Sequence, residues 1–167
     1  MEKLKLNENK GAVIAIALVL ILVSSMVGGY YLITHLSPPE GYSTINLLDA
    51  QQKKAIDYPE LLIVNHNSTF NVYFEVENHM GSSRQCQVQI KVTNETITTL
   101  PVPVNPVSNY TEKVENGQTW ENLATVSINQ PGNYSAVFEL WLSYGNSGVF
   151  TFTYDYCVLP IEVIDQA

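Results

Sequence analysis

The sequence predicts an all-β domain, an antiparallel β-sandwich of about seven strands, behind a single N-terminal transmembrane helix. Three observations lead to this prediction. Residues 12–36 contain no Asp, Glu, Lys or Arg. After residue 39, apolar and polar residues alternate with the period of a strand, and no helical period competes. The alternating runs recur about every ten residues, separated by turn residues, as in a sandwich of short strands.

The composition excludes several classes of protein. The 167 residues give room for one domain and a short appendage. A net charge of −8 with only 14% charged residues argues against a nucleic-acid-binding protein, because few cations could neutralise phosphates. A hydrophobic fraction of 46% argues against intrinsic disorder. Two cysteines are too few for a disulfide-stapled miniprotein or a four-cysteine zinc site.

The N-terminal apolar segment determines the expected topology. At roughly 1.5 Å per residue, residues 12–32 would span about 31 Å as a helix, enough to cross the hydrocarbon core of a bilayer. Lys3, Lys5 and Lys10 precede this segment, whereas no Lys or Arg follows it before Lys53. The positive-inside rule therefore predicts a single-pass protein of the cell membrane, with a cytoplasmic N-terminus and an extracellular C-terminal domain.

The chain is expected to divide into four parts. They are a short basic cytoplasmic segment at 1–11, a transmembrane helix at 12–36, a tether at 37–57 and an extracytoplasmic β-sandwich at 58–167. Prolines at 38 and 39 should end the helix, because proline lacks an amide donor. The exported part has a net charge near −9, so it should stand off an anionic lipid surface.

Processing of the N-terminus has three interpretations. We expect an uncleaved anchor. A signal peptide fits less well, because the apolar run exceeds the usual core of about 7–15 residues and no A-x-A site follows it. In the third interpretation, Lys10 and Gly11 directly before the apolar run resemble the cleavage site of archaeal type IV prepilins. That resemblance implies cleavage after Gly11 and a new N-terminus at Ala12.

Two predicted strands, residues 70–77 and 86–92, show the clearest alternation, and residues 78–83 between them supply turn residues. A peripheral first strand is expected at 45–48. The other candidate strands are 61–64, 96–104, 120–128, 134–144 and 149–163.

Two of these segments carry a special feature. Pro101 and Pro103 deny amide donors, so the strand at 96–104 is expected at a sheet edge. In the last segment, aromatic residues occupy even positions and aliphatic residues then occupy odd positions. This change of phase predicts a β-bulge near Asp155 and Tyr156.

Short motifs along the domain occur in a recognisable order. They are Tyr58-Pro59-Glu60, Glu77-Asn78-His79, Gly117-Gln118-Thr119-Trp120-Glu121-Asn122 and Gly132-Asn133-Tyr134. In this order they resemble the domain-of-unknown-function 1616 family of archaeal membrane-associated proteins, over residues 58–164. The resemblance implies an Ig-like sandwich outside the cell. Many members carry several membrane helices before the domain, whereas this chain has one, and the family has no established activity, so no site is transferred.

Cys86 and Cys157 are the only cysteines, and both lie at core-facing strand positions of an exported domain. We expect them to form a disulfide, which would stabilise by roughly 4 kcal/mol in the chain-entropy model. The alternative is a pair of separate buried thiols.

Four N-x-S/T sequons mark candidate N-glycosylation sites in predicted turns or strand ends, and we expect at least one to be occupied in the native host. They are Asn67, Asn94, Asn109 and Asn133.

No catalytic or metal-binding pattern accompanies these features. The three histidines lack ligand spacing, the acidic residues are scattered, and no nucleophile or phosphate-loop motif occurs. We therefore expect a protein that is not an enzyme, uses no cofactor, and contacts another envelope or surface-layer protein. The alternative is a pilin-like or archaellum-associated filament component, with like subunits meeting through the helix.

Overall fold

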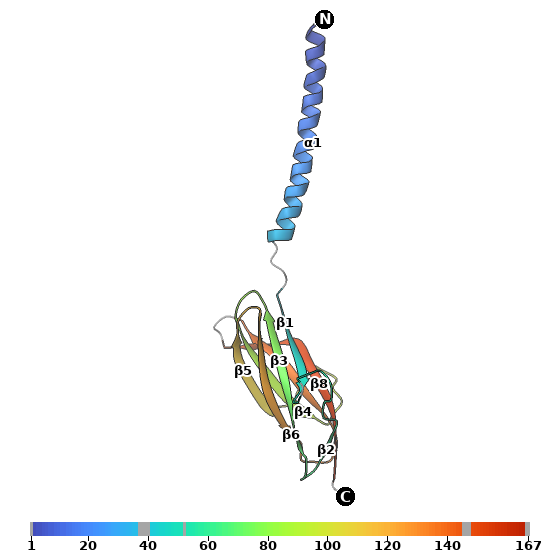
Figure 1. Cartoon of the computed structure of the whole chain (residues 1–167), viewed down its shortest axis with the longest axis vertical. Coiled ribbons are helices and arrows are strands. Elements are labelled where there is room, and N and C mark those ends of the chain that lie inside the picture. Colours follow the sequence, from blue (N-terminus) through green and yellow to red (C-terminus); the bar gives the residue numbers. More distant parts are fainter. Residues whose placement is uncertain (1, 37–40, 52, 145–147, 166–167) are drawn as a thin grey trace. The chain divides into compact units, whose positions relative to one another are not determined.

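The computed structural model describes residues 2–36, 41–51, 53–144 and 148–165. The chain divides into two compact units, Met1–Glu40 and Gly41–Ala167 (Figure 1).

The first unit contains one helix, α1 (Glu2–Leu36). Its segment Val13–Leu32 is long and apolar enough to span a membrane, and none of it is buried in the protein. The helix ends one residue before the two prolines, as predicted. It also continues N-terminally through Gly11 to Glu2, so the bond that a prepilin peptidase would cut lies inside the helix.

The second unit is a sandwich of two sheets (Figure 1). Its strands in the described residues are β1 (Tyr42–Asp49), β2 (Leu61–Ile63), β3 (Thr69–His79), β4 (Arg84–Thr93), β5 (Ser108–Val114), β6 (Gln118–Ser127), β7 (Gly132–Ser143) and β8 (Phe150–Ile164). The smaller sheet has the order β1-β3-β6, and the larger has the order β2-β8-β7-β4-β5. Every pairing is antiparallel except that of β2 with β8, which is parallel. The predicted all-β sandwich is thus confirmed.

The core lies between the two sheets, where the alternation predicted it. The buried residues of β3 are Phe70, Val72, Phe74 and Val76, and those of β4 include Cys86, Val88 and Ile90. The ring of Phe74 packs against Tyr110 of β5 and Trp120 of β6, with ring centroids 5.3 and 5.0 Å away. Burial of each large apolar side chain stabilises the fold by roughly 1.5–3 kcal/mol.

The start of the domain differs from the prediction. The second unit begins at Gly41, and β1 pairs with β3 along its whole length, so residues 41–57 belong to the domain and not to a tether. The chain then crosses from one sheet to the other: β1 is an edge of the smaller sheet, whereas β2 is an edge of the larger one. Tyr58 in the crossover donates a hydrogen bond from its hydroxyl to the Leu47 carbonyl, at 2.5 Å. The chain from β1 to β2 thus forms the edge of both sheets in turn: β1 pairs with β3 in the smaller sheet, and β2 pairs with β8 in the larger one.

The prediction of an edge strand at 96–104 is wrong. This segment is irregular, and the strand that borders β4 is β5, which the sequence analysis missed. Three prolines within 101–106 remove amide donors, and Leu100-Pro101 is a cis peptide bond. The segment instead lies over the outer face of the larger sheet, where Val102 is buried.

A bulge in β8 is confirmed close to the predicted place. The register of β7 with β8 shifts between Glu139 and Trp141. Glu139 pairs with Tyr156 and Trp141 pairs with Phe152, so three residues of β8 lie opposite one residue of β7. Tyr154 in the bulge has a φ of 69°. Because the bulge adds an even number of residues, two, the alternation of side chains between the two faces of β8 is the same before and after it. Phe152 and Tyr156 therefore both lie on the outer face, beside their partners.

Candidate functional site

A buried ion pair lies on the outer face of the larger sheet, outside the main core. Lys91 of β4 and Glu139 of β7 are diagonal neighbours across the strand pair, because Gln89 is the direct partner of Glu139. Lys91 Nζ lies 2.8 Å from Glu139 Oε2, and their side chains are 6% and 0% exposed. The irregular segment 94–107 covers them.

Both charged groups have further hydrogen bonds. The Val102 backbone N–H donates to Glu139 Oε1 at 2.6 Å, and Trp141 Nε1 donates to Glu139 Oε2 at 3.2 Å. Lys91 Nζ donates to the Val102 carbonyl at 2.7 Å. With its charge paired to Lys91 and its acceptors occupied, Glu139 holds the segment 94–107 on the sheet.

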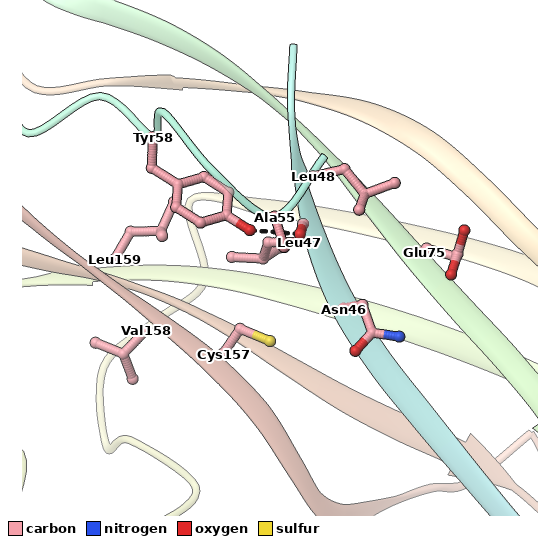
Figure 2. Close-up of a pocket in the computed structure, with 9 residues that line it drawn as sticks. All are labelled: Asn46, Leu47, Leu48, Ala55, Tyr58, Glu75, Cys157, Val158 and Leu159. Carbon is pink, nitrogen blue, oxygen red and sulfur yellow. Dashed lines mark hydrogen bonds between the residues drawn. The ribbon is translucent and has the colours of Figure 1, made fainter. Parts of the chain in front are cut away.

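A cleft of about 460 Å³ opens beside β1 and β8, under the crossover (Figure 2). We call it the β1–β8 cleft. Its lining is mostly apolar: Asn46, Leu47, Leu48, Ala55, Tyr58, Glu75, Cys157, Val158 and Leu159. In Figure 2 the Cys157 thiol points toward Asn46 of β1 and the Tyr58 hydroxyl reaches the Leu47 backbone. The Cys157 thiol also donates to the Ile45 carbonyl, at 3.4 Å between sulfur and oxygen.

Two titratable groups of the β1–β8 cleft have raised pKa values. Burial, and to a lesser degree the nearby Asp155 carboxylate, raise the pKa of the Cys157 thiol above its usual range. Burial likewise raises the pKa of the Tyr58 hydroxyl, with smaller contributions from Cys157 and Asp49. A protonated thiol is a weak nucleophile. Glu75 is the one carboxylate among the described lining residues.

The predicted disulfide is not formed. Both cysteines are free thiols, and the register explains why. Cys86 pairs with Leu142 and Cys157 pairs with Phe138, so β7 lies between them and they are offset by four residues along it. From the strand spacing and the rise per residue, the two Cα atoms lie roughly 16 Å apart, beyond the roughly 7 Å that a disulfide allows.

The four sequon asparagines are all exposed, as glycosylation requires. Asn67 lies in the turn after β2, Asn94 directly follows β4, Asn133 lies at the start of β7, and Asn109 lies on β5. The first three gather at one end of the sandwich, because Thr93 pairs with Ser135 and Thr69 pairs with Ser127. Their occupancy stays a prediction.

Among the residues that the structure describes, no three histidine, cysteine, aspartate or glutamate side chains are grouped to hold a metal ion. Gly11 lies in α1, just before the apolar span, and processing at Gly11 and Ala12 also stays a prediction.

The sequence analysis missed the Lys91–Glu139 pair. One signal could have indicated it: Glu139 interrupts the run Ala136-Val137-Phe138-Glu139-Leu140-Trp141-Leu142, which is otherwise apolar on both faces. A continuous apolar run is typical of a strand buried on both faces, and a carboxylate within one needs a buried partner.

Comparison with solved structures supports the fold. The CARDB domain of the PF1109 protein from Pyrococcus furiosus, crystallised in complex with di-metal ions, has a TM-score of 0.50 and 13% identity, covering 78% of this chain and 99% of that one. The sandwich resembles a CARDB domain. The solution structure of the same domain has a TM-score of 0.48 and 12% identity, covering 75% of this chain and 96% of that one. At these identities the likeness to the CARDB domain shows the fold alone.

A β-glucosidase from Listeria innocua also matches, with a TM-score of 0.49 and 10% identity, over 75% of this chain but only 16% of the enzyme. No protein-family model and no curated protein matches the chain. The resemblances to the domain-of-unknown-function 1616 family and to prepilins therefore gain no support here and stay predictions.

Proposed function

We propose that this protein is a single-pass membrane protein of the cell surface whose CARDB-like sandwich is a non-catalytic module for contacts within the cell envelope. The observation that carries the proposal is that the chain contains both an unburied apolar helical segment, Val13–Leu32, and a separate compact sandwich. An apolar segment of this length that the described residues leave unburied needs a lipid or protein environment of its own.

The orientation follows from charge. Lys3, Lys5 and Lys10 lie on the N-terminal side of the span, and the exported location of the sandwich follows from the positive-inside rule. Four exposed sequons and an acidic surface suit an extracellular domain.

A non-catalytic role is supported by the chemistry of the sandwich. The buried carboxylate Glu139 is neutralised by Lys91, and the Cys157 thiol in the β1–β8 cleft is held in its protonated form. The described residues thus present loops and strand edges for contact rather than a reactive group.

The proposal is tested by protease protection in the native host. We expect protease added to intact cells to remove the sandwich and leave a short membrane-embedded fragment that contains α1. Protection of the sandwich in intact cells, with digestion only in open vesicles, would reverse the orientation. Recovery of the whole chain in the soluble fraction would overturn the membrane anchor.

A filament component is the second candidate, and the observation that favours it is the continuous helix α1, which places Gly11 one turn or less before the apolar span. Cleavage after Gly11 would leave Ala12 at the head of an apolar helix able to pack with like helices. The N-terminal residue of the protein isolated from its host separates the two candidates. Met1 supports the anchor, and Ala12 supports the filament component.

A further inference from the structure

We propose that β6 is a dimerisation edge, at which a second copy of this chain adds its own β6 in antiparallel orientation. The inference goes beyond the proposed function, and it does not depend on which side of the membrane carries the sandwich. Three features support it: the lack of protection along β6, the backbone groups that β6 presents to its free side, and the register that two copies of β6 can form.

β6 is the edge strand of the smaller sheet, with β3 as its neighbour (Figure 1). An edge strand presents a row of backbone donors and acceptors to which another strand can add. Proteins protect such edges with prolines, bulges, lysines, very short strands or covering groups. The other edges of the two sheets carry protection of this kind.

The edge of β1 is covered by side chains. The Tyr58 hydroxyl donates to the Leu47 carbonyl at 2.5 Å. The Cys157 thiol donates to the Ile45 carbonyl at 3.4 Å. Two backbone acceptors of β1 that point away from β3 therefore already have partners.

The edges of the larger sheet are protected by other means. β2 has only three residues, and the part of β8 that extends beyond it contains a bulge and Pro160. At the opposite edge, β5 carries Lys113 and follows a segment with three prolines within 101–106. Prolines, bulges and lysines each oppose the addition of another strand.

β6 lacks all of these features. It runs for ten residues, Gln118–Ser127, without a proline, lysine or arginine, and it keeps one register with β3 from Thr69 to Asn78. Its one charged residue, Glu121, is paired with Lys53. A long and regular edge strand with so little charge is suited to pairing with another strand.

The backbone of β6 presents alternate residues to the free side. The N–H of Ile128, directly after β6, donates to the Ser68 carbonyl at 2.9 Å. These two residues are direct partners when the register of β6 with β3 is continued, so the even-numbered residues exchange backbone bonds with β3. The N–H and C=O groups of the odd-numbered residues therefore point away from β3. These residues are Thr119, Glu121, Leu123, Thr125 and Ser127.

Two copies of β6 fit best with Leu123 opposite its counterpart in the second copy. Thr119 then pairs with Ser127 of the other copy, and Glu121 pairs with Thr125. Every residue that points its backbone groups outward gains a partner with which it exchanges two hydrogen bonds. The axis at Leu123 is a two-fold axis, which is the symmetry of most homodimers.

The side chains favour the same register. Leu123 is 39% exposed beside Tyr73, its partner in β3, and the two-fold pairing places two leucines between two tyrosines. The two Glu121 carboxylates lie four residues apart along the paired strands, roughly 14 Å, so like charges do not face each other. This self-complementarity points to a second copy of the chain as the partner, rather than to an unrelated strand.

The first experiment is disulfide cross-linking of the full chain in phosphatidylcholine vesicles. Leu123→Cys places a thiol at the two-fold axis, where a hydrogen-bonded pair has Cα atoms about 5.5 Å apart, a distance that permits a disulfide. Thr119→Cys is the matched control, because the two copies of residue 119 would lie eight residues apart, roughly 27 Å. The wild type, with Cys86 and Cys157, gives the background. After mild oxidation we expect a covalent dimer on a non-reducing gel for Leu123→Cys, well above the other two proteins.

The second experiment is sedimentation equilibrium of the full chain in density-matched detergent micelles, which measures the association constant of the dimer. Leu123→Lys places two ammonium groups opposite each other. We expect it to lower the association constant by about tenfold or more, which corresponds to 1.4 kcal/mol. Val107→Lys changes an apolar residue outside β6 that is 56% exposed, and it should leave the constant unchanged.

A monomeric wild type would overturn the inference. A dimer that Leu123→Lys leaves intact would overturn it as well, in favour of contact through α1. Equal cross-linking of Leu123→Cys and Thr119→Cys would exclude the two-fold pairing of β6. Recovery of the chain outside the vesicles would count against the proposed anchor, and the sedimentation experiment would still decide the inference.

Discussion

Lys91 and Glu139 form a buried ion pair, 2.8 Å between Nζ and Oε2, beneath a segment without regular structure. Taking two charges out of water is costly, and their attraction offsets that cost only if every remaining donor and acceptor is used. Here Val102 supplies an N–H and a carbonyl to the pair, and Trp141 supplies its indole N–H. The pair therefore joins β4, β7 and the segment 94–107 into one unit.

Breaking this pair should cost more than replacing it. Glu139→Gln leaves Lys91 buried without a counter-charge, and we expect it to lower the free energy of unfolding by about 3–5 kcal/mol. The double variant Lys91→Met with Glu139→Leu should lose markedly less, because no charge is left buried. Urea denaturation followed by tryptophan fluorescence measures both.

The exposed pair of Lys113 with Glu115, at 2.9 Å, is the matched control. Lys113→Met should change the free energy of unfolding by no more than about 1 kcal/mol, as is usual for solvent-exposed pairs. If Glu139→Gln is as mild as this control, the buried pair does not hold the segment.

Asn78, the second-last residue of β3, should be sensitive to substitution. Its side chain is fully buried, donates from Nδ2 to the Ser82 and Val114 carbonyls, and accepts the Met80 N–H at Oδ1. Asn78→Ala leaves these backbone groups without partners, so we expect a loss of about 2–4 kcal/mol. The measurement is thermal or urea unfolding. Asn71→Ala, which removes one exposed bond from Thr125, is the control and should cost under about 1 kcal/mol.

The sequence predicted the parts of this fold that have a strong local pattern. The alternation in β3 and β4 identified their core-facing residues, and the uncharged run of α1 identified a span. β5 was missed because one of its core-facing positions, the partner of Cys86, is Glu112, which breaks the alternation. The segment 96–104 has the apolar content of a strand, but Pro101 and Pro103 lack the amide donors that regular pairing needs.

Long-range relationships were less accessible. The pairing of Lys91 with Glu139 depends on the register of β4 with β7, which lie far apart in the sequence. The expected disulfide failed for the same reason: the core-facing phase of Cys86 and Cys157 was informative, but their separation depends on strand order. Local periodicity gives the face of a strand, whereas strand order gives its neighbours.

Glycans, where they occur, should cluster at the end of the sandwich where β3 begins and β4 ends. Asn67, Asn94 and Asn133 are exposed there. We expect intact-mass analysis of the native protein to exceed the mass of the bare chain, and removal of the three asparagines as Asn→Gln to abolish most of the excess. A native mass equal to that of the bare chain would contradict this prediction.

The free thiols should leave a distinct signature at alkaline pH. Burial raises the pKa of Cys86 to about 11, from an ordinary value of 9.0. Because the folded state retains the proton more firmly, this group stabilises the fold fully below pH 9. That stabilisation is lost as the pH rises toward 11, by up to about 3 kcal/mol at 1.36 kcal/mol per unit.

The measurement is the free energy of unfolding from pH 8 to pH 10.5 for the wild type and for Cys86→Ala. The variant should be less stable at pH 8, because it leaves a small cavity, but its stability should fall less steeply with pH. The difference between the two curves isolates Cys86 from tyrosines and lysines that titrate in the same range. Parallel curves would mean that the thiol reaches solvent in the folded state. Labelling of both cysteines in unreduced, denatured protein, with slow labelling of Cys86 in the folded protein, would independently establish that both thiols are free and that this one is buried.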